Sequence, residues 1–145
     1  VSEADDYIIP IGKAKVKREG SDVTVVAHGK MYHVAKTAAD QLAKDGVEVE
    51  LIDPRTVKPL DIETIVESVK KTNRCVVVDE AHSFAGFASE IGYLIQREAF
   101  DYMDAPVARV TLPDTPAPYS KKLFDKWFPS AAQVIDAVNT VTYRK

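Results

Sequence analysis

Two alternating spacings of apolar residues restrict the fold of this 145-residue chain more than any other feature. Short apolar runs typical of β-strands occur at 23–28, 47–52, 75–78 and 107–112. Each run is followed by a segment whose apolar residues recur at the three- and four-residue spacing of one helix face. These faces comprise Val34, Ala35, Ala38, Ala39 and Leu42; Ile62, Ile65, Val66 and Val69; Phe87, Ile91, Leu94 and Ile95; and Val134, Ile135 and Val138. Repeated strand–helix units need right-handed crossovers, so the sequence predicts a mainly parallel sheet in a three-layer α/β/α sandwich.

Residues that start or stop regular structure stand at the boundaries of these segments. Gly46 follows the first helical segment in the usual stop position, and Asp61 and Ser130 stand where side chains cap the second and the last helix. The segment 53–59 holds two prolines, which predicts a stiff loop. The run at 75–78 is continuously apolar, which is typical of a strand covered on both faces.

A further strand is predicted at residues 13–18, where lysine alternates with small or apolar residues. The three lysines share one face of this strand. They form either a basic patch or, as is more common, a set of charges that keeps an edge strand from pairing with other chains. A turn cluster at 19–22 separates this strand from 23–28, so the two are predicted to form a hairpin that gives the sheet one antiparallel edge strand. The lysines concerned are Lys13, Lys15 and Lys17.

The length of the chain fits one domain, which we assign to residues 13–145. Residues 1–12 start with acidic and polar side chains and are interpreted as a linker from a missing amino-terminal domain. A formal net charge of −3 gives no reason to expect nucleic acid or an anionic membrane as a partner. The single cysteine, Cys75, permits no internal disulfide and favours a reducing compartment, so a cytoplasmic location is expected.

The strand at 75–78 runs into Asp79-Glu80-Ala81-His82, which is the strongest local motif. It is similar to the magnesium-binding box of one helicase group, but that box requires a G-x-x-x-x-G-K-[ST] phosphate loop, which this chain lacks. Asp79, Glu80 and His82 also suggest a metal-dependent enzyme, although further ligands at suitable spacing are missing. The simpler interpretation is a strand end whose polar side chains cap the next helix or contact another subunit.

His28, Gly29 and His33 mark a second candidate, at the carboxyl end of a predicted parallel strand, where open α/β sheets bind ligands. A free-standing module that binds a small anion at the Gly29 turn is therefore an alternative hypothesis. One glycine is a weak signal for it, because the dinucleotide fingerprint needs three. No G-x-S-x-G elbow is present, and Cys75 opens a buried strand, where a cysteine is usually part of the core.

Aromatic residues near the end of the chain alternate with lysines. One interpretation is a loop and short helix packed on the sheet edge. The other is a protein-contact patch, since tryptophan and tyrosine are enriched at interfaces. The residues are Tyr119, Phe124, Trp127 and Phe128, with Lys121, Lys122 and Lys126.

Longer stretches, taken together and in order, resemble a known family over nearly the whole chain. They are 5–14, 18–24, 53–56 with 59–61, 68–74, 86–91, 99–102 with 104–110, and 114–116 with 118–119. The chain resembles the carboxyl-terminal domain of the β subunit of thiamine-diphosphate-dependent 2-oxo acid dehydrogenases, most of all the pyruvate dehydrogenase E1 component. The branched-chain 2-oxo acid and acetoin dehydrogenases share most of the pattern. One departure is Pro54, where relatives commonly carry leucine.

The resemblance implies a transketolase-type carboxyl-terminal domain that serves assembly rather than chemistry. In this family, thiamine diphosphate and magnesium are held between the α subunit and the amino-terminal domain of the β subunit. No catalytic, cofactor-binding or metal-binding residue is therefore expected in this chain, which should be inactive alone. The parent reaction is oxidative decarboxylation of a 2-oxo acid with acyl transfer to a lipoyl group. Its 2-oxo acid is not specified by these residues.

The resemblance also implies three protein partners: the E1 α subunit, a second E1 β subunit, and the subunit-binding domain of the acyltransferase (E2). Glu80, His82, Ser83 and Phe84 follow a strand and are the expected subunit contacts. The acyltransferase domain is typically basic in this family, so acidic residues are expected to receive it. Asp101 and Asp104, just before the last strand, are the candidates.

Overall fold

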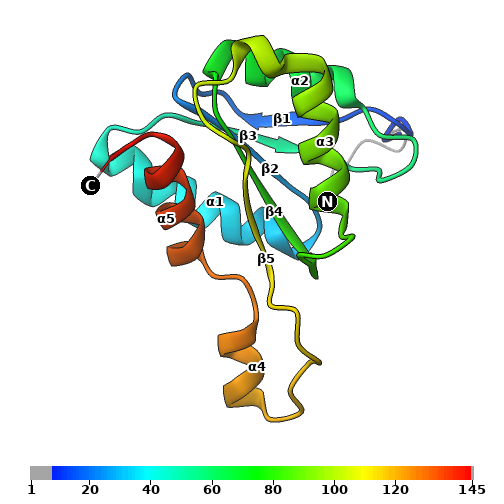
Figure 1. Ribbon diagram of the computed structural model, residues 1–145, viewed down its shortest axis with the longest axis vertical. Helices are drawn as coiled ribbons and strands as arrows, with labels where there is room; N and C mark the ends of the chain where they lie inside the picture. The colour runs from blue at the N-terminus through cyan, green and yellow to red at the C-terminus, as the bar shows by residue number, and fades with distance from the viewer. Residues whose placement is uncertain (1–7, 145) are drawn as a thin grey trace.

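A five-stranded sheet with the strand order β1-β3-β2-β4-β5 forms the centre of the structure, a computed structural model that describes residues 8–144 (Figure 1). The strands are β1 (Lys15–Arg18), β2 (Val23–Ala27), β3 (Val49–Asp53), β4 (Cys75–His82) and β5 (Ala108–Leu112). β1 is antiparallel to β3, and every other neighbouring pair is parallel. The predicted mainly parallel sheet with one antiparallel edge strand is confirmed.

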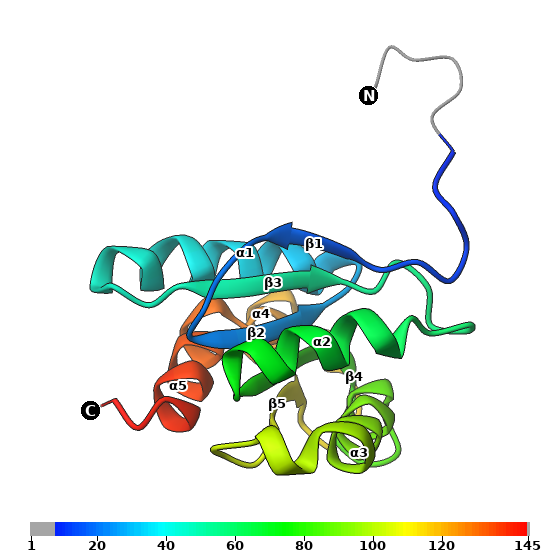
Figure 2. The same ribbon diagram turned by 90° about the horizontal axis from the view of Figure 1, so that it is seen from above.

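Helices cover both faces of this sheet, which confirms the predicted three-layer α/β/α sandwich (Figure 2). They are α1 (Lys30–Leu42), α2 (Ile62–Thr72), α3 (Phe87–Ala99), α4 (Lys121–Trp127) and α5 (Ala131–Val141), with short 3-10 turns η1 (Ala43–Asp45) and η2 (Phe100–Tyr102). α1 and α5 pack on one face, while α2 and α3 pack on the other. None of the helices between residues 8 and 144 has the length and apolar character needed to cross a membrane.

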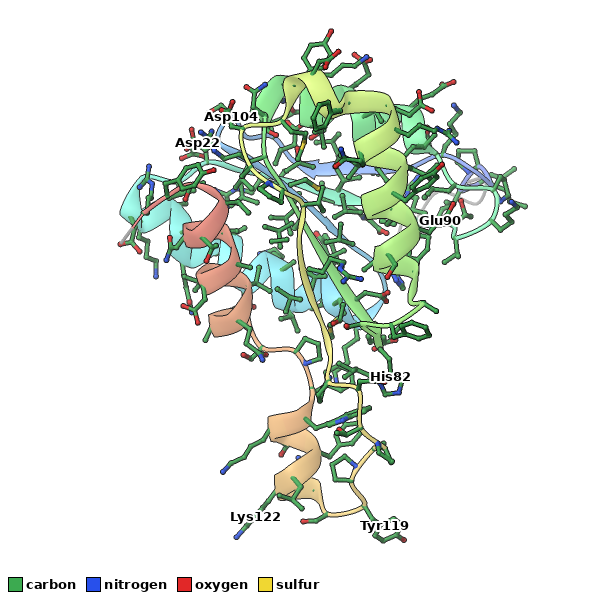
Figure 3. All side chains as sticks on the ribbon, in the orientation of Figure 1. Asp22, His82, Glu90, Asp104, Tyr119 and Lys122 are labelled. Atoms are coloured by element: carbon green, nitrogen blue, oxygen red, sulfur yellow. The ribbon has the colours of Figure 1, made fainter. Side chains whose placement is uncertain are left out.

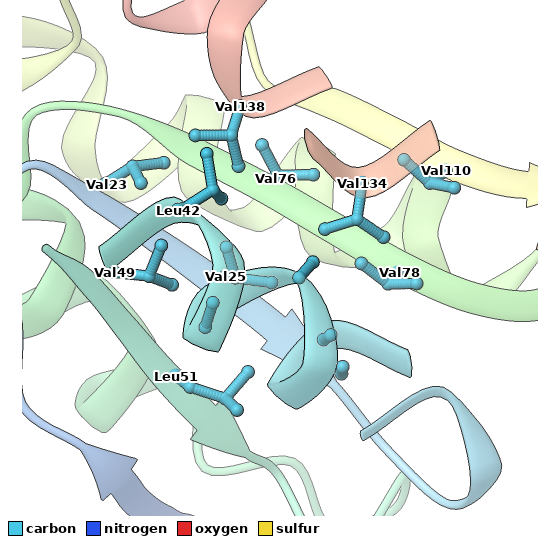
Figure 4. Close-up of a cluster of buried hydrophobic side chains, with 14 of the residues drawn as sticks. Val23, Val25, Leu42, Val49, Leu51, Val76, Val78, Val110, Val134 and Val138 are labelled. Carbon is cyan, nitrogen blue, oxygen red and sulfur yellow. The ribbon is translucent and has the colours of Figure 1, made fainter. Parts of the chain in front are cut away.

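Each face of the sheet has its own hydrophobic core, because successive side chains of a strand point to opposite faces. In β4, Val76 and Val78 pack toward α1 and α5 (Figure 4), whereas Cys75 and Val77 pack toward α2 and α3. All four are almost completely buried. Burial of one such side chain contributes roughly 1.5–3 kcal/mol, so the uninterrupted apolar run at 75–78 anchors the sheet from both faces.

The predicted helix caps are confirmed. Asp61 accepts hydrogen bonds from the backbone N–H of Thr64 and from that of Ala14, at 3.4 and 3.0 Å, so it also joins β1 to the start of α2. Ser130 and Gln133 form a reciprocal capping box at the start of α5.

The predicted hairpin between β1 and β2 is wrong, because β3 lies between these two strands. The connection crosses the first residues of β3, where the backbone N–H of Gly20 donates to Glu50 Oε2. A Cβ atom at Gly20 would lie 2.2 Å from the carbonyl carbon of Val49, so only glycine fits this crossing. The turn residues at 19–22 thus serve a crossing rather than a tight hairpin.

β1 is an edge strand, as predicted, and its lysines are exposed. Of the predicted linker, residues 1–7 lie outside the described residues. In the remainder, Gly12 donates its backbone N–H to Thr56 Oγ1 at 3.1 Å, and Ile8 and Ile11 are exposed. The division between linker and domain stays a prediction.

Candidate functional site

The carboxyl ends of β2 and β4 meet at the point where the chain connections change direction. The chain leaves β2 through α1 toward β3 on one side, and leaves β4 through α3 toward β5 on the other. In open α/β sheets this switch point is where ligands bind, because the two departing connections leave a crevice.

His28 and Asp79 contact each other at this switch point. His28 Nε2 lies 3.3 Å from Asp79 Oδ1, a charge contact rather than an aligned hydrogen bond, and the edge of the imidazole meets Phe87 at 5.3 Å between ring centroids. The Asp79 carboxylate raises the pKa of His28 above its ordinary value, against the opposing effect of burial. Burial has the largest effect on Asp79, but the contacts with His28 and with backbone N–H groups outweigh it and lower the pKa of the carboxyl.

Both oxygens of the Asp79 carboxylate hold the chain between β4 and α3. Its Oδ1 accepts the backbone N–H of Ala81 at 3.2 Å, and its Oδ2 accepts that of Ala88, in the first turn of α3, at 3.0 Å. The prediction that the strand end caps the next helix is therefore confirmed. Because the Asp79 side chain is buried, these bonds fix the path of residues 80–87 with little competition from water.

His82 does not join Asp79 in a ligand set. Its Nδ1 lies 2.9 Å from the carbonyl oxygen of Pro113, and its ring contacts Trp127 instead. Among residues 8–144, no group of three or more His, Cys, Asp or Glu side chains could hold a metal ion. The structure therefore does not bring Asp79, Glu80 and His82 together as one set of metal ligands.

The loop after β4 presents an exposed surface. Phe84, in the loop, is 83% exposed, and Glu80 and His82 at the end of β4 are exposed as well. The carbonyl of Ser83 points inward, accepting from Arg109 at 2.9 Å and from the Ser89 hydroxyl at 3.1 Å. Of the predicted subunit contacts, Glu80, His82 and Phe84 are thus accessible, while Ser83 supports the loop.

The aromatic segment near the end of the chain projects from the sandwich as an arm, residues 113–130, that contains α4 (Figure 3). The prediction that it packs on the sheet edge is wrong for most of the segment, and only Phe128, at the base, packs against the core. Its rings pack on one another, with 5.7 Å between the centroids of Phe124 and Trp127. Tyr119 is fully exposed at the tip, and Lys122 points outward there.

Contacts at the base fix the position of this arm. Trp127 Nε1 donates to Thr115 Oγ1 at 3.1 Å, so the two sides of the arm are joined. Lys30 Nζ lies 4.0 Å from the centroid of the Phe128 ring, and the His82 ring meets Trp127 at 6.0 Å. The arm and the loop after β4 therefore form one continuous surface at the carboxyl edge of the sheet.

Backbone geometry or the core explains other sequence candidates. Gly29 has a φ of 55° at the start of α1, which explains the glycine by backbone geometry, and His33 is exposed. Cys75 is completely buried, and burial raises the pKa of its thiol to about 12, so it is a core residue as predicted.

Asp101 and Asp104 lie at the opposite end of the molecule from the arm, as the position of Asp104 in Figure 3 shows. Asp101 is exposed within η2. Asp104 forms an ion pair with Arg74 at 3.0 Å and lines a shallow hollow of about 230 Å³. The other lining residues are Gln96, Phe100, Met103, Ala105 and Pro106.

Sequence reasoning missed the contact between His28 and Asp79 and the hydrogen bonds of Arg109 to Ser83 and Ser89. The first pair carried a usable signal, because both residues end parallel strands and such ends lie at one edge of a sheet. No local pattern marks Arg109, whose partners come from a distant loop and helix.

Comparison with known proteins gives one family match and several close relatives. Residues 12–134 match the family model described as "Transketolase, C-terminal domain". The chain is 49% identical over 135 residues to the pyruvate dehydrogenase E1 component subunit beta of Rickettsia conorii. The matched region covers 93% of this chain and 41% of that protein. It is 44% identical over 131 residues to the acetoin:2,6-dichlorophenolindophenol oxidoreductase subunit beta of Bacillus subtilis, covering 90% of this chain and 38% of that protein.

Solved structures give the same result for the fold. A split gene transketolase, described as an inactive beta4 tetramer, superposes with a TM-score of 0.82 and 30% sequence identity, over 98% of this chain and 45% of that one. The chain thus spans less than half the length of these curated and structural relatives.

Proposed function

This chain belongs to the transketolase C-terminal domain family, and from that membership we propose that it is the carboxyl-terminal domain of the β subunit of a 2-oxo acid dehydrogenase. The observation that carries the proposal is the 49% identity to a pyruvate dehydrogenase β subunit over 93% of this chain. An acetoin dehydrogenase β subunit is the second candidate, supported by the 44% identity to the Bacillus subtilis protein. A branched-chain 2-oxo acid dehydrogenase remains a third.

The role we propose for this domain is assembly and docking, with the chemistry located elsewhere in the parent enzyme. Thiamine diphosphate and magnesium would be bound by the α subunit and the upstream β domain. Two features support this division. The Asp79 carboxylate is engaged in holding the loop before α3, and the described residues offer no group suited to a metal ion. A cytoplasmic location is part of the proposal and rests on the single buried Cys75.

The contact surface for the α subunit would be the carboxyl edge of the sheet. Glu80, His82 and Phe84 form its inner part and the arm its outer part, with Tyr119 at the tip. An exposed phenylalanine and a fully exposed tyrosine on a folded surface are costly to leave in water and favour burial against a partner. Ser83 contributes indirectly, through its carbonyl bonds to Arg109 and Ser89.

The acyltransferase subunit-binding domain would dock at the other end, over the hollow beside Asp104. A carboxylate next to the 62%-exposed Phe100 ring offers a basic partner both charge attraction and apolar contact. Asp101 lies outside the residues that line the hollow and would act only through long-range charge. Because the two surfaces lie at opposite ends, the α subunit and the acyltransferase could bind at once.

The test is reconstitution of the parent enzyme from the full-length β subunit and its α subunit. Decarboxylation of pyruvate, acetoin cleavage and decarboxylation of branched 2-oxo acids are measured with an artificial electron acceptor. The proposal predicts activity with the full-length β subunit and none when this chain replaces it. Turnover by this chain alone would contradict the division of labour.

The variant Phe84→Ala tests the surface within the same experiment. We expect it to weaken α-subunit binding about tenfold or more, because an exposed aromatic anchor is removed. Tyr93→Ala, which removes a 59%-exposed aromatic residue from α3, is the matched control and should leave binding unchanged. Equal effects of the two variants would refute the assignment of this surface.

A further inference from the structure

A groove runs between α2 and α3, the two helices that cover one face of the sheet. It consists of two hollows that share Ile62 in their walls, one of about 530 Å³ and one of about 340 Å³. Figures 1 and 2 show the two helices side by side on this face. These two hollows together are called the α2–α3 groove.

The larger hollow is lined mainly by apolar side chains. Its wall comes from the loop before α2, where Val57 is 53% exposed, and from Phe87 and Leu94 of α3, which are both half-buried. An apolar side chain of a partner that entered this hollow would be removed from water, which favours binding. The other apolar residues of the wall are Pro59, Leu60 and Ile62.

The smaller hollow is acidic, because Glu63, Glu67 and Glu98 line it. Lys70 pairs with Glu67 at 3.4 Å, and Arg97 pairs with Glu98 at 2.6 Å, but Glu63 has no ion-pair partner between residues 8 and 144. Glu63 and Glu67 are four residues apart on one face of α2, where like charges repel each other. A cation supplied by a partner would relieve this repulsion.

A further acid brings negative charge to the apolar hollow. Glu90 lines that hollow from α3, is exposed, and has no ion-pair partner in the part of the chain that the structure describes. Figure 3 shows Glu90 on the side of α3 turned away from β5. Lys58 is the opposing charge in the same wall. The groove therefore combines an apolar hollow with carboxylates from both helices.

We propose that the α2–α3 groove binds a basic amphipathic helix of a partner protein. A groove of this kind accepts the apolar face of such a helix, whose anchor side chain would enter the larger hollow. Lysine or arginine side chains beside the anchor would meet Glu63 and Glu90, so the charge of the groove selects a basic partner over an acidic one. The groove shares no residue with the surfaces proposed for the α subunit and the acyltransferase.

Fluorescence anisotropy with a labelled synthetic peptide tests the proposal on this chain. The probe is an amphipathic helix of about 15 residues with leucines on one face and lysines beside them. A second peptide carries glutamate in place of each lysine. We expect the lysine peptide to bind about tenfold or more tightly than the glutamate peptide. Its affinity should fall as salt is added, because salt screens exposed charges.

Two pairs of variants locate the binding site. Val57→Ser removes apolar surface from the larger hollow and should weaken binding about threefold, whereas Leu123→Ser, at a similarly exposed position of the arm, should leave it unchanged. Glu63→Gln removes an unpaired carboxylate and should also weaken binding about threefold. Its control is Asp136→Asn, an exposed acid of α5 on the other face of the sheet. The two groove changes combined should weaken binding about tenfold.

Equal affinity for the two peptides, or equal effects of the groove variants and their controls, would overturn the proposal. Circular dichroism of each variant checks that it is folded. The result is independent of the proposed function, because Val57 and Glu63 lie outside the two surfaces on which that function rests. Variants at these two positions should therefore still bind the α subunit and the acyltransferase.

Discussion

At the scale of single residues, the contact between His28 and Asp79 is the most informative feature, because it links two strands and the loop that presents Phe84. Asp79 holds backbone N–H groups, and His28 supplies a positive charge beside it when protonated. The pair is therefore a structural support for the proposed contact surface.

This support should make stability depend on pH. The pKa of His28 is raised above its ordinary 6.5, so its contribution is fully present below pH 6.5 and is lost as the pH rises through the raised pKa. The pKa of Asp79 is lowered from 3.8, so its contribution is present above pH 3.8 and is lost as the pH falls through the lowered pKa. His28→Gln should cost about 1 kcal/mol between these two values and less at alkaline pH.

Urea unfolding at a series of pH values checks this expectation. His33→Gln, at an exposed position of α1, is the control and should change the free energy of unfolding by less than about 0.5 kcal/mol. A cost of His28→Gln that grows as the pH rises would contradict the proposed contact.

At the scale of elements, the crossing between β1 and β2 distinguishes this domain from a simple row of strand–helix units. Gly20 passes over β3 at a distance that leaves no space for a side chain, whereas Gly92 in α3 faces open space. The structure therefore excludes a side chain at Gly20 and has room for one at Gly92.

Replacing each glycine by alanine tests the crossing. Gly20→Ala should lower the free energy of unfolding by about 3 kcal/mol or more, because the new methyl group meets the backbone of Val49. Gly92→Ala should raise it by up to about 1 kcal/mol, since alanine favours the helix. Chemical denaturation gives both values, and a Gly20→Ala chain as stable as the native one would show that the strand order is wrong.

The helices and most of the strands were predictable from the sequence, because the buried face of each element requires apolar residues at the spacing of a helix or a strand. The caps at Asp61 and Ser130 were predictable for the same local reason. The pairing of β1 with β3 was not predictable from the sequence. The turn residues at 19–22 suit a tight hairpin as well as a crossing, and β3, which lies between β1 and β2, comes from a distant part of the chain. The arm was misplaced because Phe124 and Trp127 pack on each other, and only Phe128 packs against the core.

At the scale of the whole molecule, the contact surfaces proposed for the α subunit and the acyltransferase lie at opposite ends of the sandwich. The arm and the loop after β4 lie at one end, and Asp104 with its hollow lies at the other (Figures 1 and 3). The proposed assembly role needs such a separation, because two partners can then bind at the same time.

The proposed docking role is tested by calorimetric titration of this chain with the subunit-binding domain of the acyltransferase of its parent enzyme. Thiamine diphosphate with magnesium is titrated in parallel. We expect binding of the protein and not of the cofactor, and an affinity that falls about tenfold with Asp104→Asn but little with the control Asp101→Asn. Binding of the cofactor without the protein would contradict the claim that this domain serves assembly rather than chemistry.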